Sequence, residues 1–439
     1  MKIVFVENRG KTVFWSAVAR ELMRHGHDVS WLVQNPAYAS AAEVGTRFFL
    51  GFPKTTDLVD APIPPAVLTD RGRQYFGAGS QHYSFYANRI AVALDDLNPD
   101  VVIGEPTLMH ELLTIEECNR RNIPYLHPTM TRYPAGRFSI LSGATQVPLM
   151  VNHNSLPSTQ LLEQAKGIVA GSSLPSYMKK PSSFGAPKHA ARKILGQSRV
   201  SLGWFMGERF NTPSPLRKLA LQRNLRTNLK SWEALARLPN VDNSIILYPL
   251  QMQPEANIDV WGRPYVDQFA FIQRLLEALP TNDYVAVKAN PKAKYEISER
   301  LLELARKDPR VILLPLDCSM VEAQNRSVGV VTVSGTVGYE AVFGRGRCLS
   351  LCHPVLERYF PAFHAQTPEE AVDRLLADDH TGRGNIELGA ALLARLVADS
   401  FEGTINEPQF DPHCLSAGNI KKVANALVRV MQYIKQGAQ

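Results

Sequence analysis

The sequence contains few cysteines and places none of them for a disulfide framework or a zinc site. The five cysteines are scattered, their number is odd, and none forms a C-x-x-C pair. No apolar run is long enough to span a bilayer. The first ten residues, MKIVFVENRG, carry their charges too early for a signal peptide and fit a first strand. We therefore expect a protein of the reducing cytoplasm.

Several motifs of nucleotide binding and catalysis are also missing. We find no G-x-x-x-x-G-K-[ST], no G-x-G-x-x-G, no H-E-x-x-H, no D-x-D and no G-x-S-x-G. These absences exclude a P-loop, a standard dinucleotide site and the common zinc-protease and serine-hydrolase signatures. The lack of D-x-D also disfavours a metal-dependent transferase, so we expect no bound metal and no resident cofactor.

Positive charge is concentrated in one part of the chain. The formal net charge is +7, and residues 178–230 contain 12 Lys or Arg against a single acid, Glu208. Such a segment fits contact with an anionic membrane surface or an anionic acceptor, and it fits a solvated connector equally well. No recognised nucleic-acid module accompanies the charge, so we expect no nucleic-acid partner.

Strand and helix patterns alternate in two stretches of the chain. The first stretch has strand patterns at 3–6, 29–33, 101–104 and 124–126, with helical patterns between them. The second stretch begins near residue 241 and has strand patterns at 244–250, 285–288, 311–314, 328–333 and 348–351. This alternation predicts an α/β fold with two doubly wound parallel sheets, whose ligands bind in a shared cleft outside the carboxyl ends of the strands.

The chain length and these patterns predict two domains and two shorter segments. We expect a Rossmann-like domain at 1–175, a basic helical linker or insert at 176–240, and a second Rossmann-like domain at 241–400. Residues 401–439 would form a C-terminal helix, because Ile420, Val423, Leu427 and Met431 follow helical spacing. We expect this helix to pack on the protein, with a membrane-surface helix as the alternative.

The most informative stretch is VVTVSGTVGYEA at 330–341, a strand pattern followed by a glycine turn and a helix start. Ser334, Gly335 and Thr336 would place backbone N–H groups and two hydroxyls at the positive end of a helix. Such a helix start is a site for an anion, most often a phosphate. The alternative is an ordinary strand-to-helix corner.

Polar residues also follow the other strands of the second stretch. Gln253 and Glu255 alternate after one strand, Lys288 ends the next, and Asp317 follows a third. Lys288 fits phosphate neutralisation, and Asp317 fits a helix cap better than a ribose contact. Glu340 fits either contact with sugar hydroxyls or a structural role in the first helical turn.

Two carboxylates, Glu7 and Glu105, follow strands of the first stretch. They would lie at the same edge of one sheet, where either fits a general base or a nucleophile for chemistry at a sugar carbon. Arg132 and Arg137, which follow another strand, fit binding of a carboxylate or phosphate. We therefore expect Glu105, Glu7 and Arg132 to be the catalytic candidates.

Three segments together resemble a known family. PLQMQPEANIDVWG, then VKANPK, then VTVSGTVGYEAVFGRGRCLSL follow one another as in the bacterial capsule polysaccharide biosynthesis family, which contains the Kdo transferases. The resemblance covers mainly 244–351, with weaker similarity in GEP at 104 and TRYPAGRF at 131. It implies the GT-B fold, in which two Rossmann-like domains face a cleft and a C-terminal helix crosses back. The resemblance makes residues 1–175 the acceptor domain and residues 241–400 the nucleotide-sugar donor domain.

The resemblance also implies a donor site and a reaction. Lys288 and Pro291 match the family's K-x-H-P element, Ser334, Gly335 and Thr336 match its Ser/Thr loop, and Asn290 stands where the family often has histidine. Asparagine donates a hydrogen bond but carries no charge, so the nucleotide stays open between CMP and others. The donor-binding residues expected in all are Lys288, Asn290, Pro291, Ser334, Gly335, Thr336, Glu340, Gln253 and Glu255.

The implied function is a metal-independent glycosyltransferase. It would move a sugar from a nucleotide sugar to a capsule-type polysaccharide or its lipid-linked precursor, in the cytoplasm and peripheral to the inner membrane. The expected partners are the nucleotide sugar, a glycan or glycolipid acceptor, and an anionic membrane surface contacted through 178–230. Three alternatives stay open: a sugar-nucleotide 2-epimerase, a teichoic-acid-type polyol-phosphate transferase, and a non-catalytic assembly partner.

Overall fold

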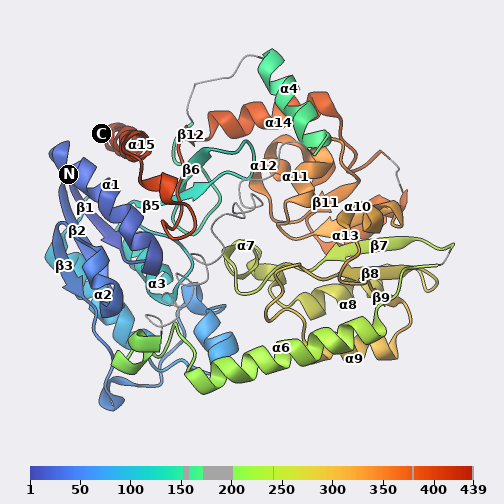
Figure 1. Ribbon diagram of the computed structural model, residues 1–439, viewed down its shortest axis with the longest axis horizontal. Coiled ribbons are helices and arrows are strands. Elements are labelled where there is room, and N and C mark those ends of the chain that lie inside the picture. The colour runs from blue at the N-terminus through green and yellow to red at the C-terminus, as the bar shows by residue number, and fades with distance from the viewer. Residues whose placement is uncertain (152–157, 172–200, 241, 378–379, 438–439) are drawn as a thin grey trace. The chain divides into compact units, whose positions relative to one another are not determined.

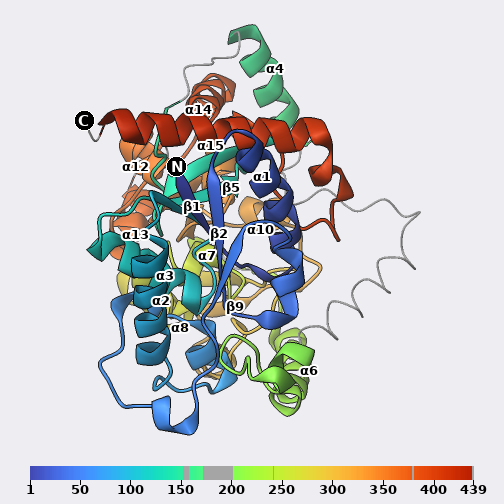
Figure 2. The same cartoon turned by 90° about the vertical axis from the view of Figure 1, so that its left-hand side faces the viewer.

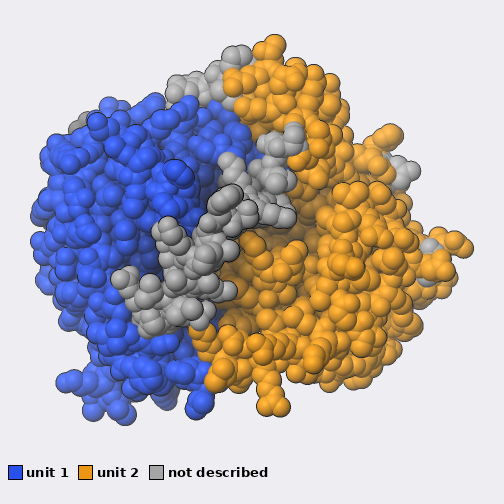
Figure 3. All heavy atoms as spheres, viewed as in Figure 1, with its two compact units in different colours: residues 1–155, 174–217, 395–439 blue, residues 156–173, 218–394 orange. Residues whose placement is uncertain are grey.

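The chain forms two sheets and divides into two compact units, with one sheet in each unit. Figure 3 shows the two units in different colours. The computed structural model describes residues 1–151, 158–171, 201–240, 242–377 and 380–437. Of these, unit 1 contains 1–151, 201–217 and 395–437, and unit 2 contains 158–171, 218–240, 242–377 and 380–394. The chain thus leaves unit 1, forms most of unit 2 and returns.

The sheet of unit 1 has the strand order of a Rossmann-like fold. Its strands are β1 (Lys2–Val6), β2 (Asp28–Val33), β3 (Thr46–Phe49), β4 (Val101–Ile103), β5 (Tyr125–Met130), β6 (Arg137–Ser142) and β12 (Phe401–Glu402). In space they run β12-β6-β5-β4-β1-β2-β3. The five strands from β3 to β5 are parallel, and β6 and β12 add an antiparallel edge. The order of the parallel strands reverses between β1 and β4, which is the topological switch point.

The sheet of unit 2 repeats this order in fewer strands. Its strands are β7 (Ile245–Pro249), β8 (Tyr284–Lys288), β9 (Val311–Leu313), β10 (Gly329–Thr332) and β11 (Cys348–Ser350), in the spatial order β11-β10-β7-β8-β9. All pair in parallel. They are apolar and almost wholly buried, as expected for strands covered on both faces. The switch point here lies between β7 and β10.

Helices connect the strands and cover the sheets (Figure 1). Those of unit 1 include α1 (Thr12–Arg24), α2 (Tyr83–Leu97), α3 (Met109–Arg120) and α15 (Ala417–Gly437). Those of unit 2 include α4 (Ser158–Val169), α7 (Ala256–Asp259), α8 (Gln268–Ala278), α9 (Glu299–Lys307), α10 (Met320–Asn325), α11 (Val337–Val342), α12 (Pro354–Tyr359) and α13 (Pro368–Ala377). Two more, α6 (Pro215–Leu235) and α14 (Ile386–Ala398), carry the chain between the units. Among the helices of the described ranges, none combines the length and apolar character that a bilayer crossing requires.

The C-terminal helix packs against the first helix of the chain, and α15 and α1 lie side by side in Figures 1 and 2. Val423, Leu427 and Met431 of α15 share one buried core with Phe14 and Val18 of α1. Burial of these apolar side chains stabilises the returned helix. The packing expected from the helical spacing is confirmed, and the apolar face of α15 is not available to a membrane surface.

The fold class expected from the sequence is confirmed. The chain is α/β, with two Rossmann-like parallel sheets in tandem and a C-terminal helix that returns to the first unit, which is the GT-B type of architecture. The pattern of alternating strands and helices did not predict β3, β6 or β12. Of these, β6 forms an antiparallel hairpin with β5 rather than following a helix, and β12 pairs with β6 at the edge of the sheet. The domain limits proposed from the sequence stay predictions, and residues 178–200 of the basic segment lie outside the described residues.

Candidate functional site

The switch point of unit 1 places Glu7 and Glu105 at the carboxyl edge of its sheet. Glu7 directly follows β1, and Glu105 follows β4 after one glycine. Both side chains are buried. Their positions agree with the expectation that these carboxylates share one sheet edge, but their contacts differ.

Glu7 holds two loops through backbone N–H groups. Its Oε1 accepts from Arg9 N at 2.6 Å and its Oε2 accepts from Asn35 N at 3.0 Å. Burial raises the pKa of Glu7 to about 6, against the lowering effect of these hydrogen bonds and of the Arg9 charge. Since both carboxylate oxygens are engaged, Glu7 is built to order the loops after β1 and β2.

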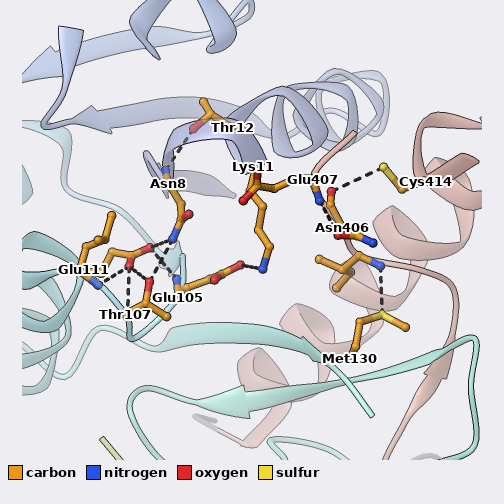
Figure 4. A network of polar contacts seen from close by, with 12 residues as sticks. Asn8, Lys11, Thr12, Glu105, Thr107, Glu111, Met130, Asn406, Glu407 and Cys414 are labelled. Atoms are coloured by element: carbon orange, nitrogen blue, oxygen red, sulfur yellow. Dashed lines mark hydrogen bonds and ion pairs between the residues drawn. The ribbon is translucent and has the colours of Figure 1, made fainter. Parts of the chain in front are cut away.

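Glu105 forms an ion pair with Lys11. The Lys11 Nζ donates to Glu105 Oε1, and Figure 4 shows the two side chains pointing toward each other. Burial acts to lower the pKa of Lys11, but the nearby carboxylates of Glu105, Glu407 and Glu111 outweigh it, so the pKa is raised. A fixed ammonium group at this edge holds the Glu105 carboxyl in place and compensates its charge.

Glu111 closes the loop between β4 and α3. Its Oε2 accepts from Leu108 N at 2.8 Å and from Thr107 Oγ1 at 2.8 Å, and its Oε1 accepts from Asn8 Nδ2 at 2.8 Å. Burial and the neighbouring charge of Glu105 raise the pKa of Glu111. This buried carboxyl ties the end of β1 to the start of α3 and so fixes the backbone around Glu105 (Figure 4).

Residues 208–212, which no sequence pattern indicated, also contact the carboxyl edge of the unit 1 sheet. Arg9 Nη2 donates to Asn211 O at 2.8 Å, and Glu208 Oε1 accepts from Asn211 N at 2.8 Å. His110 Nε2 donates to the Glu7 carbonyl at 2.9 Å, and the Asn211 amide lies 3.3 Å from its Nδ1. Glu208, the lone acid of the basic segment, is therefore a buried structural residue. The only indication of this role in the sequence is that Glu208 is the single acid among the cations of residues 178–230.

The raised pKa of Glu7 gives a testable pH dependence. Between the ordinary pKa of 4.5 and about 6, the folded state binds more protons than the unfolded state, so stability falls as the pH rises through this window. The shift corresponds to about 2 kcal/mol. We expect the difference in urea-unfolding free energy between the wild type and Glu7→Gln to fall by that amount from pH 4 to pH 7. A constant difference would show that the Glu7 carboxyl keeps its ordinary pKa in the fold.

The two arginines after β5 lie in different settings. Arg132 is half-buried in the turn that joins β5 to β6. Arg137 begins β6 and is buried, with Nε donating to Ser400 Oγ at 2.9 Å and Nη2 donating to Ser400 O at 2.8 Å. The expectation that Arg137 binds a carboxylate or phosphate is not supported by these contacts, which secure the end of α14. A catalytic role for Arg132 stays a prediction.

In unit 2, the switch point is bridged by Gln251 and Ser334. The Ser334 Oγ lies 2.9 Å from the Gln251 amide group and donates to Asn257 O at 2.7 Å. With the amide oriented to satisfy both of its ends, Gln251 Oε1 accepts from Ser334 N at 2.9 Å and from Val333 N at 3.2 Å. Ser334 is fully buried. Its hydroxyl therefore joins two loops, and donor binding by Ser334 stays a prediction.

The motif PLQMQPE continues this buried network. Gln268 Nε2 donates to Gln251 O at 2.8 Å and to Gln253 Oε1 at 2.9 Å. Gln253 Nε2 donates to Asp259 Oδ1 at 2.9 Å, and Asp259 Oδ2 accepts from Glu255 N at 2.9 Å. The side chain of Gln253 is thus occupied by scaffold contacts, while that of Glu255 is half-buried. Donor binding by these two residues stays a prediction.

Lys288 is the buried cation of this edge. It ends β8 and has only 8% of its surface exposed. Burial lowers its pKa, and the nearby Cys318 and Asp317 act in the opposite direction. Within the part of the chain that the structure describes, the Lys288 ammonium has no ion pair or hydrogen bond. The Lys288 Nζ is not among the buried side-chain atoms that lack a partner, so the ammonium reaches solvent at the carboxyl end of β8, where it fits contact with an anionic ligand.

The turn after β8 is shaped by Asn290 and Pro291. Asn290 Oδ1 accepts from Lys292 N at 2.8 Å, which makes a local turn, and Pro291 is exposed at its tip. Glu296 holds the far side of this loop, since its Oε2 accepts from Lys294 N at 3.0 Å. The loop that carries the expected K-x-H-P element is therefore ordered by its own polar contacts.

The SGT turn is tighter than the sequence suggested. Gly335 N donates to Thr332 Oγ1 at 3.1 Å, and a Cβ atom at Gly335 would lie 2.5 Å from that oxygen, which requires glycine here. Thr336 is half-buried and starts α11, which spans only Val337–Val342. Glu340 lies 3.9 Å from Arg345. The expected phosphate contacts at Gly335, Thr336 and Glu340 stay predictions.

Two further hydrogen bonds lie near the carboxyl edge of the unit 2 sheet. Ser319 Oγ, not Asp317, caps α10 by accepting from Glu322 N at 3.1 Å, so the expected cap at Asp317 is wrong. His353 Nε2 donates to the Gly335 carbonyl at 3.0 Å, a contact that no motif indicated. In the ranges covered by the structure, no three His, Cys, Asp or Glu side chains cluster as ligands for a metal ion.

Comparison with known proteins gives distant likenesses. No family model and no curated protein matches the sequence. The UDP-GlcNAc 2-epimerase of Rickettsia bellii is 14% identical, with 99% of this chain and 98% of that chain covered and a TM-score of 0.29. The enzyme of the same name from Neisseria meningitidis, bound to UDP-GlcNAc, is 12% identical over 99% and 100%, with a TM-score of 0.26. The calicheamicin glycosyltransferase CalG4 is 13% identical over 98% of each chain, with a TM-score of 0.26. At these values the likenesses carry no argument about the reaction.

Proposed function

We propose that this chain is a glycosyltransferase that uses a nucleotide-sugar donor. The observation that carries the proposal is Lys288, whose side chain is mostly buried at the carboxyl end of β8 and whose ammonium forms no ion pair within the described residues. Ligands of Rossmann-like sheets bind at the carboxyl ends of their strands. The diphosphate or phosphate of a nucleotide sugar supplies the missing negative charge.

The chemistry that we propose for unit 1 uses Glu105. A sugar transfer needs a group that removes the proton of the acceptor hydroxyl as that oxygen attacks the anomeric carbon. Glu105 lies at the switch point of its sheet, and Lys11 fixes one of its oxygens. Glu7 is the weaker candidate, because backbone N–H groups engage both of its oxygens. Lys288 would compensate the charge that develops on the departing nucleotide phosphate.

We propose a cell-surface glycan of the capsule type, or its lipid-linked precursor, as the acceptor. This part of the proposal rests on the resemblance of the segments at 244–351 to the capsule polysaccharide biosynthesis family. Asn290 leaves the nucleotide undecided, since it replaces the histidine that is frequent in that family. The donor therefore has to be identified by experiment.

A product assay tests the proposal. The purified full-length protein is incubated with CMP-, UDP-, GDP- and ADP-sugars, with and without lipid-linked and soluble oligosaccharide acceptors. We expect nucleotide release and a new glycosidic bond only when both donor and acceptor are present. Conversion of UDP-GlcNAc alone would identify an epimerase, and a phosphodiester product from an activated polyol would identify a polyol-phosphate transferase. Absence of turnover with all donors would favour an assembly partner.

A further inference from the structure

The loop at 403–411, which follows β12, brings a further acidic side chain to the edge of the unit 1 sheet that holds Glu105. This side chain is Glu407, which lies beside Lys11 in Figure 4. A Cβ atom at Gly10 would lie 2.6 Å from Glu407 Oε2, so the carboxylate packs directly against the backbone that precedes Lys11. The return of the chain to unit 1 therefore adds a carboxylate next to the Lys11–Glu105 ion pair.

Polar contacts hold this loop and its carboxylate in place. The side chain of Asn419, near the start of α15, accepts from Thr404 N at 2.7 Å and donates to Thr404 O at 2.8 Å. Phe410 N donates to the Glu407 carbonyl at 2.9 Å, which closes a turn. Gln409 Nε2 donates to Glu407 Oε2. The loop thus presents the Glu407 carboxylate in a defined position.

Lys11 is the side chain through which Glu407 is placed to act. The half-buried ammonium of Lys11 donates to Glu105 Oε1. Burial acts to lower the pKa of Lys11, and the negative charges of Glu105 and then Glu407 act to raise it. The ammonium is therefore attracted by two carboxylates, and its pairing with Glu105 is made in the field of Glu407.

The two carboxylate oxygens of Glu105 differ in what they contact. Oε1 accepts from Lys11. Oε2 accepts no hydrogen bond from the described residues, and it is not one of the buried polar atoms without a partner, so it reaches solvent. An acceptor hydroxyl can approach Glu105 at Oε2 only if the ammonium stays on Oε1, because an ammonium at Oε2 would occupy the place of the hydroxyl.

We propose that Glu407 is a positioning residue for Glu105 and acts through Lys11. Its carboxylate restrains Lys11 on Glu105 Oε1 and so keeps Oε2 available. The acceptor proton then moves to Oε2 as the acceptor oxygen bonds to the anomeric carbon and the bond from that carbon to the nucleotide phosphate breaks. The inference rests on the proposed function, because it takes Glu105 as the general base.

A double-mutant cycle in turnover tests whether Glu407 acts through Lys11. Glu407→Gln should lower kcat by about 10-fold to 100-fold, the scale for a misplaced reacting group, and leave the KM for the donor unchanged. Glu407→Asp should recover part of the loss. In the Lys11→Met protein, Glu407→Gln should have little further effect, because the residue through which it acts is absent. Additive losses would overturn the proposal and indicate direct contact of Glu407 with substrate.

Two more variants support this cycle. Gly10→Ala keeps every charge but displaces the Glu407 carboxylate, so it should lower kcat in the same direction even if Lys11→Met fails to fold. Glu402→Gln is the matched control, since Glu402 is an exposed carboxylate of β12 that pairs with Lys422. It should leave kcat unchanged. A loss in Glu402→Gln equal to that in Glu407→Gln would overturn the proposal.

The pKa of Lys11, measured without substrate by NMR of ¹³C-labelled lysine, separates this inference from the proposed function. Glu407→Gln should lower that pKa, because it removes a negative charge beside the ammonium, and Glu402→Gln should not change it. An unchanged pKa in Glu407→Gln would overturn the inference even in a protein that transfers sugars. A lowered pKa in a protein without turnover would refute the proposed function and support the restraint of Lys11 by Glu407.

Discussion

Replacing Glu105 with glutamine should lower turnover by about 100-fold to 10,000-fold, the range for loss of a general base. Glutamine has the same shape but takes no proton from an acceptor hydroxyl. The affinity for the nucleotide should be unchanged, because Glu105 belongs to unit 1 and Lys288 to unit 2. Initial rates at saturating donor and acceptor, together with donor titration, measure both quantities.

The matched control for this variant is Glu43→Gln. Glu43 is also a carboxylate of unit 1 that pairs with a cation, Arg20, but it is exposed and does not lie at the end of a sheet strand. Its replacement should leave turnover unchanged. Since Glu105→Gln removes the ion-pair partner of the half-buried Lys11, the unfolding temperature has to be measured as well. Full turnover in a folded Glu105→Gln protein would move the catalytic assignment to Glu7 or elsewhere.

Replacing Lys288 with methionine should weaken nucleotide binding by about 10-fold to 100-fold, the value of a charge-assisted hydrogen bond. The same change should not lower the unfolding temperature of the free protein. The Lys288 side chain is mostly buried and its ammonium forms no ion pair among the described residues, so methionine fills a similar volume and breaks no salt bridge. Nucleotide affinity should therefore fall while the unfolding temperature does not. A general loss of structure would lower both.

Lys307→Met serves as the control for charge. Lys307 lies on α9 of the same unit, and its side chain is 78% exposed. Its replacement removes one positive charge without touching the sheet edge, so nucleotide affinity should stay at the wild-type value. If Lys288→Met bound nucleotide as tightly as the wild type did, the donor site would have to lie away from the carboxyl end of β8.

The architecture could be predicted because each sheet depends on local patterns. Short β-branched runs such as IILYP and GVVT alternate with amphipathic helices, and this alternation is sufficient to expect parallel sheets. The order of strands in space, which creates the two switch points, follows from packing between distant segments. For that reason the sequence indicated which residues follow strands, but not which of them meet.

Ser334 shows why the site was harder to predict than the fold. In the sequence it is a hydroxyl beside a glycine at a helix start, which fits phosphate binding. In the structure it contacts Gln251, 83 residues earlier along the chain, and is closed off from solvent. Glu208 is a similar case, since it looks like a stray acid in a basic segment but orders Asn211 at the edge of the unit 1 sheet. Both roles depend on long-range contacts that no local pattern contains.

A nucleotide screen by thermal shift tests the central claim most directly. The full-length protein and its Lys288→Met variant are heated with CMP, UDP, GDP and ADP at equal concentrations. One nucleotide should raise the unfolding temperature of the wild type, because a ligand that binds only the folded state stabilises it, and the variant should lose most of this increase. A wild-type protein that none of the four nucleotides stabilises would contradict the account.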